Sequence, residues 1–416
     1  MTQLDPTAQR DFAHEVTRRL QEAGYESYWA GGCVRDRLLE RVPSDYDVAT
    51  SARPEQIRKL FGKHRTLAIG AAFGVITVLG PKVAGPIEVA SFRVDEAYSD
   101  GRRPDGIRYS TAREDALRRD FTINGMFYNP VTDEVIDFVS GREDLKRGVV
   151  RAIGDANDRF DEDKLRMLRA VRFAATFDFE LEAATREAIA RRPEQLSIVS
   201  AERVGVEMRR MLVHPRRAKA IELMRSTGLL PVVVPHAVAE LDDEHWRETL
   251  ALLDALERPS FPTALAALLL DTGKPELVGE VNRHWRLANK EVGRSEWLMT
   301  HAEVLAAAAE QPWSRVQRIL IQEGIDDLVT LLAARVSLGT FAAADLQFVR
   351  ERLAWSAERL DPSPLISGDD LVERGLQPGK AFRELLEAVR DAQLNGQIAT
   401  AEEALALVDR LRDPRG

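Results

Sequence analysis

The chain has 416 residues, more than one compact core usually holds, so we expect two to four domains. A composition that is 44% hydrophobic and 30% charged excludes a disordered chain and is typical of a soluble globular protein. A net charge of −9 argues against nonspecific coating of nucleic acid, although it allows a local basic surface. No apolar run approaches the roughly 20 residues of a membrane span, and no signal-peptide pattern opens the chain. With a single cysteine, Cys33, the sequence predicts no intrachain disulfide and a cytoplasmic protein.

The first 155 residues alternate between helix and strand patterns. Helices are expected at 7–23, at 34–39, from Pro54 and at 112–126, and strands at 28–30, 46–49, 74–79, 87–92 and 134–138. Residues 95–109 are polar and contain Gly and Pro, which predicts a loop. Beyond residue 155 the periodicity is helical, at 161–177, 183–190, 200–213, 215–227 and in several segments to the end. This order predicts an α+β head followed by an all-α remainder.

The first candidate for a chemical site is the pair Asp45 and Asp47, in the sequence SDYDV. Residues two apart on a strand project from the same face, so the two carboxylates are expected side by side. Such a pair is costly unless a proton or a cation neutralises it. Hard oxygen ligands suit Mg²⁺, and substrate phosphates complete the coordination shell of the ion. We therefore predict that both residues are catalytic metal ligands; the alternative is a pair of exposed turn residues after Pro43.

A glycine pair stands before that strand. Gly31 and Gly32 lead from an expected strand into a helix, and Arg35 follows one turn later. Backbone N–H groups approach a phosphate closely where side chains are absent, and a guanidinium adds a charge-assisted bond. We interpret the stretch as a cradle for a nucleoside triphosphate, with a simple tight turn as the alternative. Glu88, on a neighbouring expected strand, is the candidate third catalytic carboxylate, unless it is a surface residue of an edge strand.

The segment EDKLRMLRAVRF, residues 162–173, is expected to be one helix with Asp163 and Arg166 on a shared face. A carboxylate accepts from an exocyclic amino group, and a guanidinium donates to a ring nitrogen. Cytosine and adenine offer that combination, whereas uracil and guanine offer the reverse. The pair thus predicts selection of C and A, with Arg169 and Arg172 free for phosphates or stacking. An ion pair on a solvated helix face is the alternative.

Five sequence blocks, in this order, resemble the class II tRNA nucleotidyltransferases, the CCA-adding enzymes, which are related to bacterial poly(A) polymerases. The blocks are GGCVRD with SDYDVAT, RRDFTINGM (118–126), DFVSGREDLKRGVVRAIGD (137–155), EDKLRMLRAVRF (162–173) and SAERVGVEMRRML (200–212). Residues 367–398 are also similar to members of that family, so the resemblance spans most of the chain.

The resemblance implies a head with a nucleotidyltransferase-type mixed sheet, followed by an all-α neck, body and tail in an elongated seahorse shape. The expected domains are a head at 1–150, a base-recognising neck at 151–215, a helical body at 216–360 and a tRNA-binding tail at 361–416. The implied activity is addition of CCA to the tRNA acceptor end from CTP and ATP, without a nucleic-acid template, and with two Mg²⁺ ions.

The resemblance also assigns roles to individual residues. Asp45 and Asp47 bind Mg²⁺, while Asp163 and Arg166 act as the template for the base. The implied contacts to the nucleotide come from Gly32, Arg35, Arg119, Asn124, Arg169 and Arg172, beside Gly31. Glu202, Arg203 and Glu207 are expected to support the template helix.

Departures and rival activities also follow from the sequence. Gly125 replaces the alanine usual in the family, and Leu270 stands where a metal-binding histidine would lie in hydrolase-bearing relatives, so no hydrolase is expected. The rivals are an A-adding enzyme or poly(A) polymerase and, more remotely, an inactive RNA-binding protein. The segment LAIGAAFGVITVL lacks the basic pair of poly(A) polymerases, and a loop YSDGRRP (98–104) is present, and both features favour CCA addition.

Overall fold

The computed structural model describes residues 4–95, 106–235, 238 and 240–412. The chain divides into two compact units, Met1–Ala239 with Arg283–Arg286, and Glu240–Asn282 with Leu287–Gly416. This division is coarser than the four expected domains. No helix in the described part of the chain is long and apolar enough to cross a membrane.

The first unit is built on a mixed seven-stranded sheet in the order β3-β4-β5-β2-β1-β8-β9. The strands are β1 (Ser27–Ala30), β2 (Asp47–Thr50), β3 (Thr66–Leu67), β4 (Val75–Leu79), β5 (Pro86–Ser91), β8 (Phe127–Asn129) and β9 (Glu134–Ile136). β2 and β5 are parallel, with Asp47 opposite Glu88, and the other neighbours are antiparallel. The sheet therefore brings Asp47 and Glu88 onto adjacent strands, whereas Asp45 lies just before β2 and not on the strand where the spacing argument placed it.

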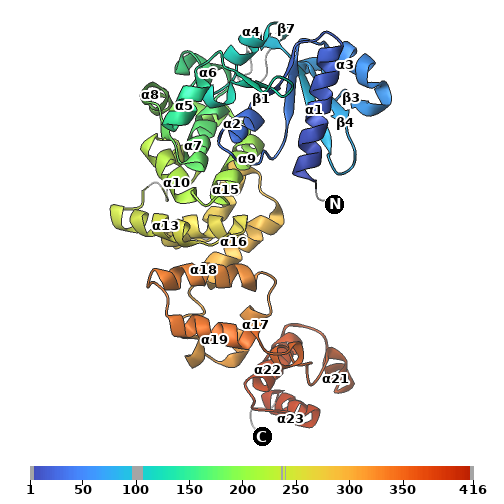
Figure 1. Cartoon of the computed structure of the whole chain (residues 1–416). Coiled ribbons are helices and arrows are strands. Elements are labelled where there is room, and N and C mark those ends of the chain that lie inside the picture. The colour runs from blue at the N-terminus through green and yellow to red at the C-terminus, as the bar shows by residue number, and fades with distance from the viewer. Residues whose placement is uncertain (1–3, 96–105, 236–237, 239, 413–416) are drawn as a thin grey trace. The chain divides into compact units, whose positions relative to one another are not determined.

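Helices of the head pack on this sheet because one face of each is apolar. α1 (Pro6–Glu22) begins at Asp5, whose carboxylate accepts from the Thr7 N–H at 2.8 Å. Its buried side chains Phe12, Val16 and Leu20 face the sheet, and α1 contacts β1 and β2 (Figure 1). The other head helices are α2 (Gly32–Leu38), α3 (Pro54–Phe61), α4 (Ala112–Leu117) and α5 (Gly141–Arg147).

Three sequence-based expectations about the head were wrong. The segment 95–109 is not a loop throughout, since β6 (Arg93–Asp95) and β7 (Ile107–Tyr109) pair at its two ends. The helix expected at 112–126 ends at Leu117 and is followed by a 3₁₀ turn, Thr122–Asn124. The apolar residues after that turn form β8, which the sequence reading missed, because a short apolar run does not distinguish a buried strand from a buried helix.

The helix expected at 161–177 is two helices, α6 (Ala156–Glu162) and α7 (Leu165–Phe177). Asp163 lies between them with an extended backbone, and its side chain accepts from the Leu165 N–H at 3.1 Å. Such a local bond from a side chain competes with the helical hydrogen bond and breaks the helix. Asp163 and Arg166 therefore do not share a helix face in the way that the spacing predicted.

In the described residues, the rest of the first unit is helical except for one short parallel pair, β10 (Val149–Val150) with β11 (Glu180–Leu181), neither of which was expected. Its helices are α8 (Ala183–Arg191), α9 (Ala201–Leu212), α10 (Arg217–Ser226) and α11 (Leu230–Val233). α7 packs against both α9 and α10, which hold its buried face. This packing fixes the position of the α7 arginines.

The second unit contains most of the remaining helices. They are α13 (Asp243–Ala255), α14 (Phe261–Leu269), α15 (Leu277–Trp285, whose last residues belong to the first unit), α16 (Asn289–His301), α17 (Trp313–Leu320), α18 (Ile325–Ser337), α19 (Ala343–Leu353), α20 (Ala357–Leu360), α21 (Gly368–Glu373), α22 (Lys380–Leu394) and α23 (Ala401–Arg412). α14 is buried along its length among α13, α16 and α18.

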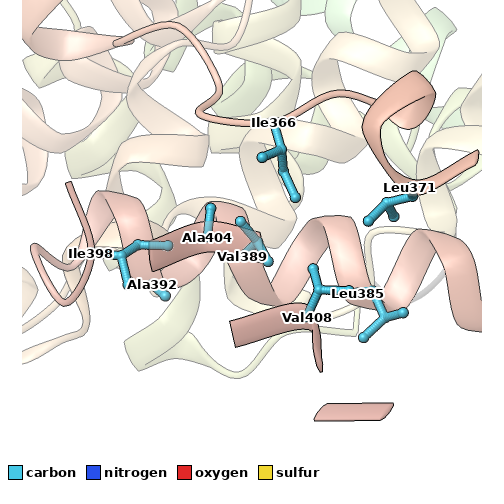
Figure 2. Close-up of a cluster of buried hydrophobic side chains, with 8 residues drawn as sticks. All are labelled: Ile366, Leu371, Leu385, Val389, Ala392, Ile398, Ala404 and Val408. Carbon is cyan, nitrogen blue, oxygen red and sulfur yellow. The ribbon is translucent and has the colours of Figure 1, made fainter. Parts of the chain in front are cut away.

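The C-terminal helices have a hydrophobic cluster of their own. Figure 2 shows its eight buried side chains, which are Ile366, Leu371, Leu385, Val389, Ala392, Ile398, Ala404 and Val408. All of them lie between residues 366 and 408. The cluster thus belongs to the segment that the sequence analysis assigned to the tail.

Candidate active site

A cleft of about 660 Å³ opens on the first unit where the sheet meets α7. It is lined by Gly31, Gly32, Arg35, Asp36, Ser44, Asp45, Asp47, Arg118, Arg119, Asp120, Asn124, Asp163, Arg166, Arg169, Arg172, Phe173 and Arg210. Except for Glu88, every site residue proposed from the sequence lies in this lining. The structure therefore brings together residues that are more than 100 positions apart in the chain.

The glycine turn forms one wall of the cleft. Gly31 has a φ of +74°, which L side chains rarely adopt, and α2 starts at the next residue. A Cβ at Gly31 would lie 3.2 Å from the Arg119 Nη1 atom. Both the backbone conformation and the close approach of Arg119 thus explain the first glycine of the pair.

The carboxylates lie on the sheet side of the cleft. Desolvation in the cleft, followed by the charges of Asp45 and Glu88, raises the pKa of Asp47 to about 6, against the opposing effect of Arg119. Burial raises the pKa of the neighbouring Cys33 thiol to about 12, so Cys33 is a neutral packing residue. In the described residues no group of three or more His, Cys, Asp or Glu side chains is arranged to hold a metal. Asp45 and Asp47 both line the cleft, where their carboxylates are close enough for the charge of Asp45 to raise the pKa of Asp47.

A chain of hydrogen bonds joins the glycine turn to α7. Arg35 Nη1 donates to Asn124 Oδ1 at 2.7 Å, and Asn124 Nδ2 donates to Asp120 Oδ1 at 3.2 Å. Asp120 Oδ2 then accepts from Arg169 Nε and Nη2 at 2.9 and 2.6 Å. Asp120 is buried, yet Arg169 and its other donors lower its pKa to about 2. Asp120 is thus a permanent anion that fixes Asn124 and Arg169 together.

Arg119 is held on the same wall by Asp115. Both its Nε and its Nη2 donate to Asp115 Oδ2, at 3.2 and 2.9 Å, and Asp115 also accepts from Arg118. Burial would raise the pKa of Asp115, but these two arginines lower it overall. One buried carboxylate therefore orients two arginines that line the cleft.

The base-reading candidates are each held by a different partner. Asp163 Oδ2 accepts from Arg203 Nη2 of α9 at 2.6 Å, whereas Arg166 Nη1 donates to Glu162 at 2.5 Å and to the Arg159 carbonyl at 3.0 Å. The Asp163 carboxylate and the Arg166 guanidinium therefore do not form an ion pair with each other, which was the alternative interpretation of their spacing. Both side chains line the cleft.

α9 supports α7 through Glu207. This buried carboxylate accepts from Arg172 Nε at 2.5 Å and lies 3.4 Å from Arg210 Nη1. Arg169 and Arg172, expected to be free for substrate, thus already have carboxylate partners, Asp120 and Glu207. Glu202, also expected to support that helix, is exposed and lies 3.8 Å from Arg286.

Sequence reasoning missed six residues of the lining, namely Asp36, Ser44, Arg118, Asp120, Phe173 and Arg210. Each of them stands inside a sequence block that carried the family resemblance, so position within a recognised motif was an available signal. The loop YSDGRRP, with Arg102 and Arg103, falls outside the described residues.

Comparison with known proteins gives concordant matches. Residues 27–151 match the poly A polymerase head domain, and residues 178–241 match the probable RNA and SrmB-binding site of polymerase A. A protein of Lactobacillus delbrueckii subsp. bulgaricus named CCA-adding enzyme is 32% identical over 98% of this chain and 99% of its own length. A CCA-adding enzyme of Bacillus velezensis is 33% identical over 92% of this chain and 93% of its own. The structure of the Bacillus stearothermophilus CCA-adding enzyme in complex with CTP has a TM-score of 0.78 at 28% identity, covering 98% of both chains.

Proposed function

Because the chain belongs to the family of CCA-adding enzymes, we propose that it is a tRNA nucleotidyltransferase that adds C, C and A to tRNA 3′ ends. CTP and ATP are the donors, and no nucleic-acid template is needed. The observation that carries the proposal is a single cleft that combines a carboxylate pair, arginines for phosphates, and Asp163 with Arg166. The proposal places the enzyme in the cytoplasm, where tRNA, CTP and ATP occur together.

Asp45 and Asp47 fit divalent cations, since they are neighbouring hard oxygen donors, and since desolvation, followed by the charges of Asp45 and Glu88, raises the pKa of Asp47. We propose that they hold two Mg²⁺ ions, with Glu88 as a further carboxylate on the adjacent strand. Ions bound there would assist loss of the 3′-hydroxyl proton and stabilise charge on the leaving pyrophosphate.

The chain's own residues bind and orient the triphosphate. In the reaction the tRNA 3′-oxygen bonds to the α-phosphorus, the bond from that phosphorus to the bridging oxygen breaks, and pyrophosphate leaves while the hydroxyl proton passes to solvent. Gly31 and Gly32 allow close approach of the phosphates, and Arg35 and Arg119 donate to them. Asn124 lies beside Arg35 and contacts the sugar or a phosphate. Positioned donors of this kind stabilise negative charge that develops during transfer.

Base choice rests on Asp163 and Arg166. Arg203 donates to Asp163 and orients this carboxylate as a hydrogen-bond acceptor, while Glu162 orients Arg166 as a donor. Cytosine and adenine each present an amino group beside an acceptor nitrogen, and so they match both groups. Uracil and guanine would meet an acceptor with an acceptor and a donor with a donor.

The test uses tRNA transcripts that end before the CCA, after one C and after two Cs, each incubated with a single NTP and Mg²⁺ and then sequenced at the 3′ end. We expect C from CTP on the first two and A from ATP on the third. Asp45→Ala and Asp47→Ala are the inactive controls. Addition of A alone would identify an A-adding enzyme, long A tails would identify a poly(A) polymerase, and no addition would identify an RNA-binding protein.

A further inference from the structure

The ring of Phe173, in the second half of α7, lines the cleft but takes no part in metal binding, phosphate binding or base selection. Its side chain belongs to the lining, although the residue is only 5% exposed. It follows Arg172 directly and Arg169 by four positions, and the four-residue spacing places Arg169 on the same face of the helix.

Three guanidiniums of the cleft pack on this ring. The Cζ atom of Arg172 lies 4.1 Å from the ring centroid, and those of Arg169 and Arg35 each lie 5.3 Å from it. All three distances are within the roughly 6 Å over which a cation is attracted to the face of an aromatic ring. Two of these arginines come from α7, whereas Arg35 comes from α2 beside the glycine turn.

The ring is itself held in place by aromatic neighbours. Phe121 meets it edge to face, with centroids 5.8 Å apart, and Phe177 stacks with it at 6.1 Å. Phe177 also lies under Arg35, whose Cζ atom is 4.3 Å from its centroid. The arginines therefore rest on a buried aromatic platform and not on a mobile side chain.

Hydrogen bonds hold the N–H edges of these three guanidiniums, whereas the Phe173 ring packs against their faces. The N–H edges are engaged by Asn124 and Asp36 for Arg35, by Asp120 for Arg169 and by Glu207 for Arg172. An edge contact leaves rotation of the guanidinium about that contact free, and a ring against its face restricts the rotation. Since each guanidinium has five N–H donors, the restricted group keeps further donors available for a ligand.

We propose that Phe173 is a positioning residue that holds Arg35, Arg169 and Arg172 in one array and thereby sets the affinity of the cleft for the triphosphate of either nucleotide. This inference rests on the proposed function and extends it to a residue that touches neither base nor metal. The array joins the glycine turn to the base-reading helix, so its loss weakens CTP and ATP binding alike. Base choice does not change, because Asp163 and Arg166 are held by Arg203 and Glu162.

The test replaces Phe173 by phenylalanines carrying one, two and three ring fluorines, which withdraw electron density from the ring face with little change in shape. Binding of CTP and of ATP is measured by titration calorimetry without tRNA. We expect both dissociation constants to rise stepwise, reaching about tenfold at three fluorines, as the ring loses its attraction for cations. Phe173→Trp, which keeps an electron-rich face, should bind more tightly than Phe173→Leu. Misincorporation of U and G should stay at the wild-type level.

The matched control is the same fluorination at Phe92, which is 1% exposed and packs on Phe127 and Tyr28 in the head core. Fluorination there should leave nucleotide affinity unchanged. Affinities that are flat across the Phe173 series, or that fall equally at Phe92, would overturn the inference even if the wild type adds CCA. Conversely, a wild type that adds no nucleotide refutes the proposed function, while the trend in CTP binding still decides the role of Phe173.

Discussion

At the scale of single residues, the raised pKa of Asp47 has a measurable consequence for metal binding. Its pKa of about 6 exceeds the roughly 3.9 of an unfolded aspartate, so the folded protein binds this proton more tightly. In the metal-free protein the ionised Asp47 is therefore unfavourable at neutral pH, and that cost is relieved as the pH falls through 6. A metal at this site must displace the proton below that pH.

We expect Mg²⁺ affinity, measured by calorimetry, to be nearly constant above pH 7. Below pH 6 it should fall, approaching about tenfold per pH unit where one proton is displaced. Asp47→Asn should bind Mg²⁺ weakly and without that slope. An affinity that stays constant from pH 7 to pH 5 would show that Asp47 is not a ligand.

Arg166 is the residue whose loss should affect base choice most directly. Arg166→Ala removes one half of the proposed reader, whereas Arg203 still holds Asp163 at 2.6 Å. A lost bidentate-type base contact costs about 1–3 kcal/mol of discrimination, or roughly ten- to a hundredfold. We expect U or G to be incorporated measurably and C and A to be added more slowly. Arg192→Ala, at an arginine paired loosely with Asp161 at 3.7 Å outside the cleft lining, is the control. An unchanged misincorporation ratio in folded Arg166→Ala would reduce Arg166 to a structural role.

At the scale of elements, α9 orients the readers because it packs closely on its neighbours. At Gly205 a Cβ would lie 2.0 Å from the carbonyl oxygen of Trp285, which is backbone and does not move aside easily. Trp285 is buried and donates from its indole N–H to the Val233 carbonyl at 2.7 Å. The distance between α9 and this segment thus requires glycine.

Gly205→Ala is therefore expected to destabilise the protein by about 1–3 kcal/mol, as overpacked cores do. Thermal unfolding monitored by circular dichroism measures the change. Gly279→Ala is the matched control, since Gly279 is also helical, in α15, and has no atom within 4 Å of the added Cβ. That variant should be neutral or stabilised by up to about 1 kcal/mol. Equal effects of the two substitutions would contradict the close-packing argument.

At the scale of the whole molecule, the C-terminal cluster and the active-site cleft belong to different compact units. Leu371 is fully buried in that cluster, so Leu371→Ala should cost about 2–5 kcal/mol of local stability. We expect faster hydrogen exchange across residues 366–408, weaker tRNA binding and unchanged CTP affinity. Leu411→Ala, at a residue that is 47% exposed, is the control. Loss of CTP binding in Leu371→Ala would show that the two units are energetically coupled.

Features that depend on neighbouring residues could be predicted from the sequence. The mixed α/β head, the helical remainder and the Gly31–Gly32 turn follow from local periodicity and spacing, and the family follows from motifs in order. Asp45 and Asp47 both line the cleft, but only Asp47 lies on the predicted strand. The secondary structure of short apolar runs and polar segments was ambiguous in the sequence, as at β8 and at the ends of 95–109. These segments are strands because a neighbouring strand pairs with each of them.

How the arginines are held could not be predicted from the sequence. Asp120 and Arg169 are 49 residues apart, and Asp163 and Arg203 are 40 apart, so no spacing rule joins either pair. Each contact forms because burial makes an unpaired charge costly, and the packing of α7 against the head and α9 determines which opposite charge is within reach. The same packing placed Phe173 beneath three guanidiniums that the sequence shows as a simple stripe. Long-range pairing of buried charges, which has no local signature, is the physical reason that the carboxylate partners of the α7 arginines had to be seen in the fold.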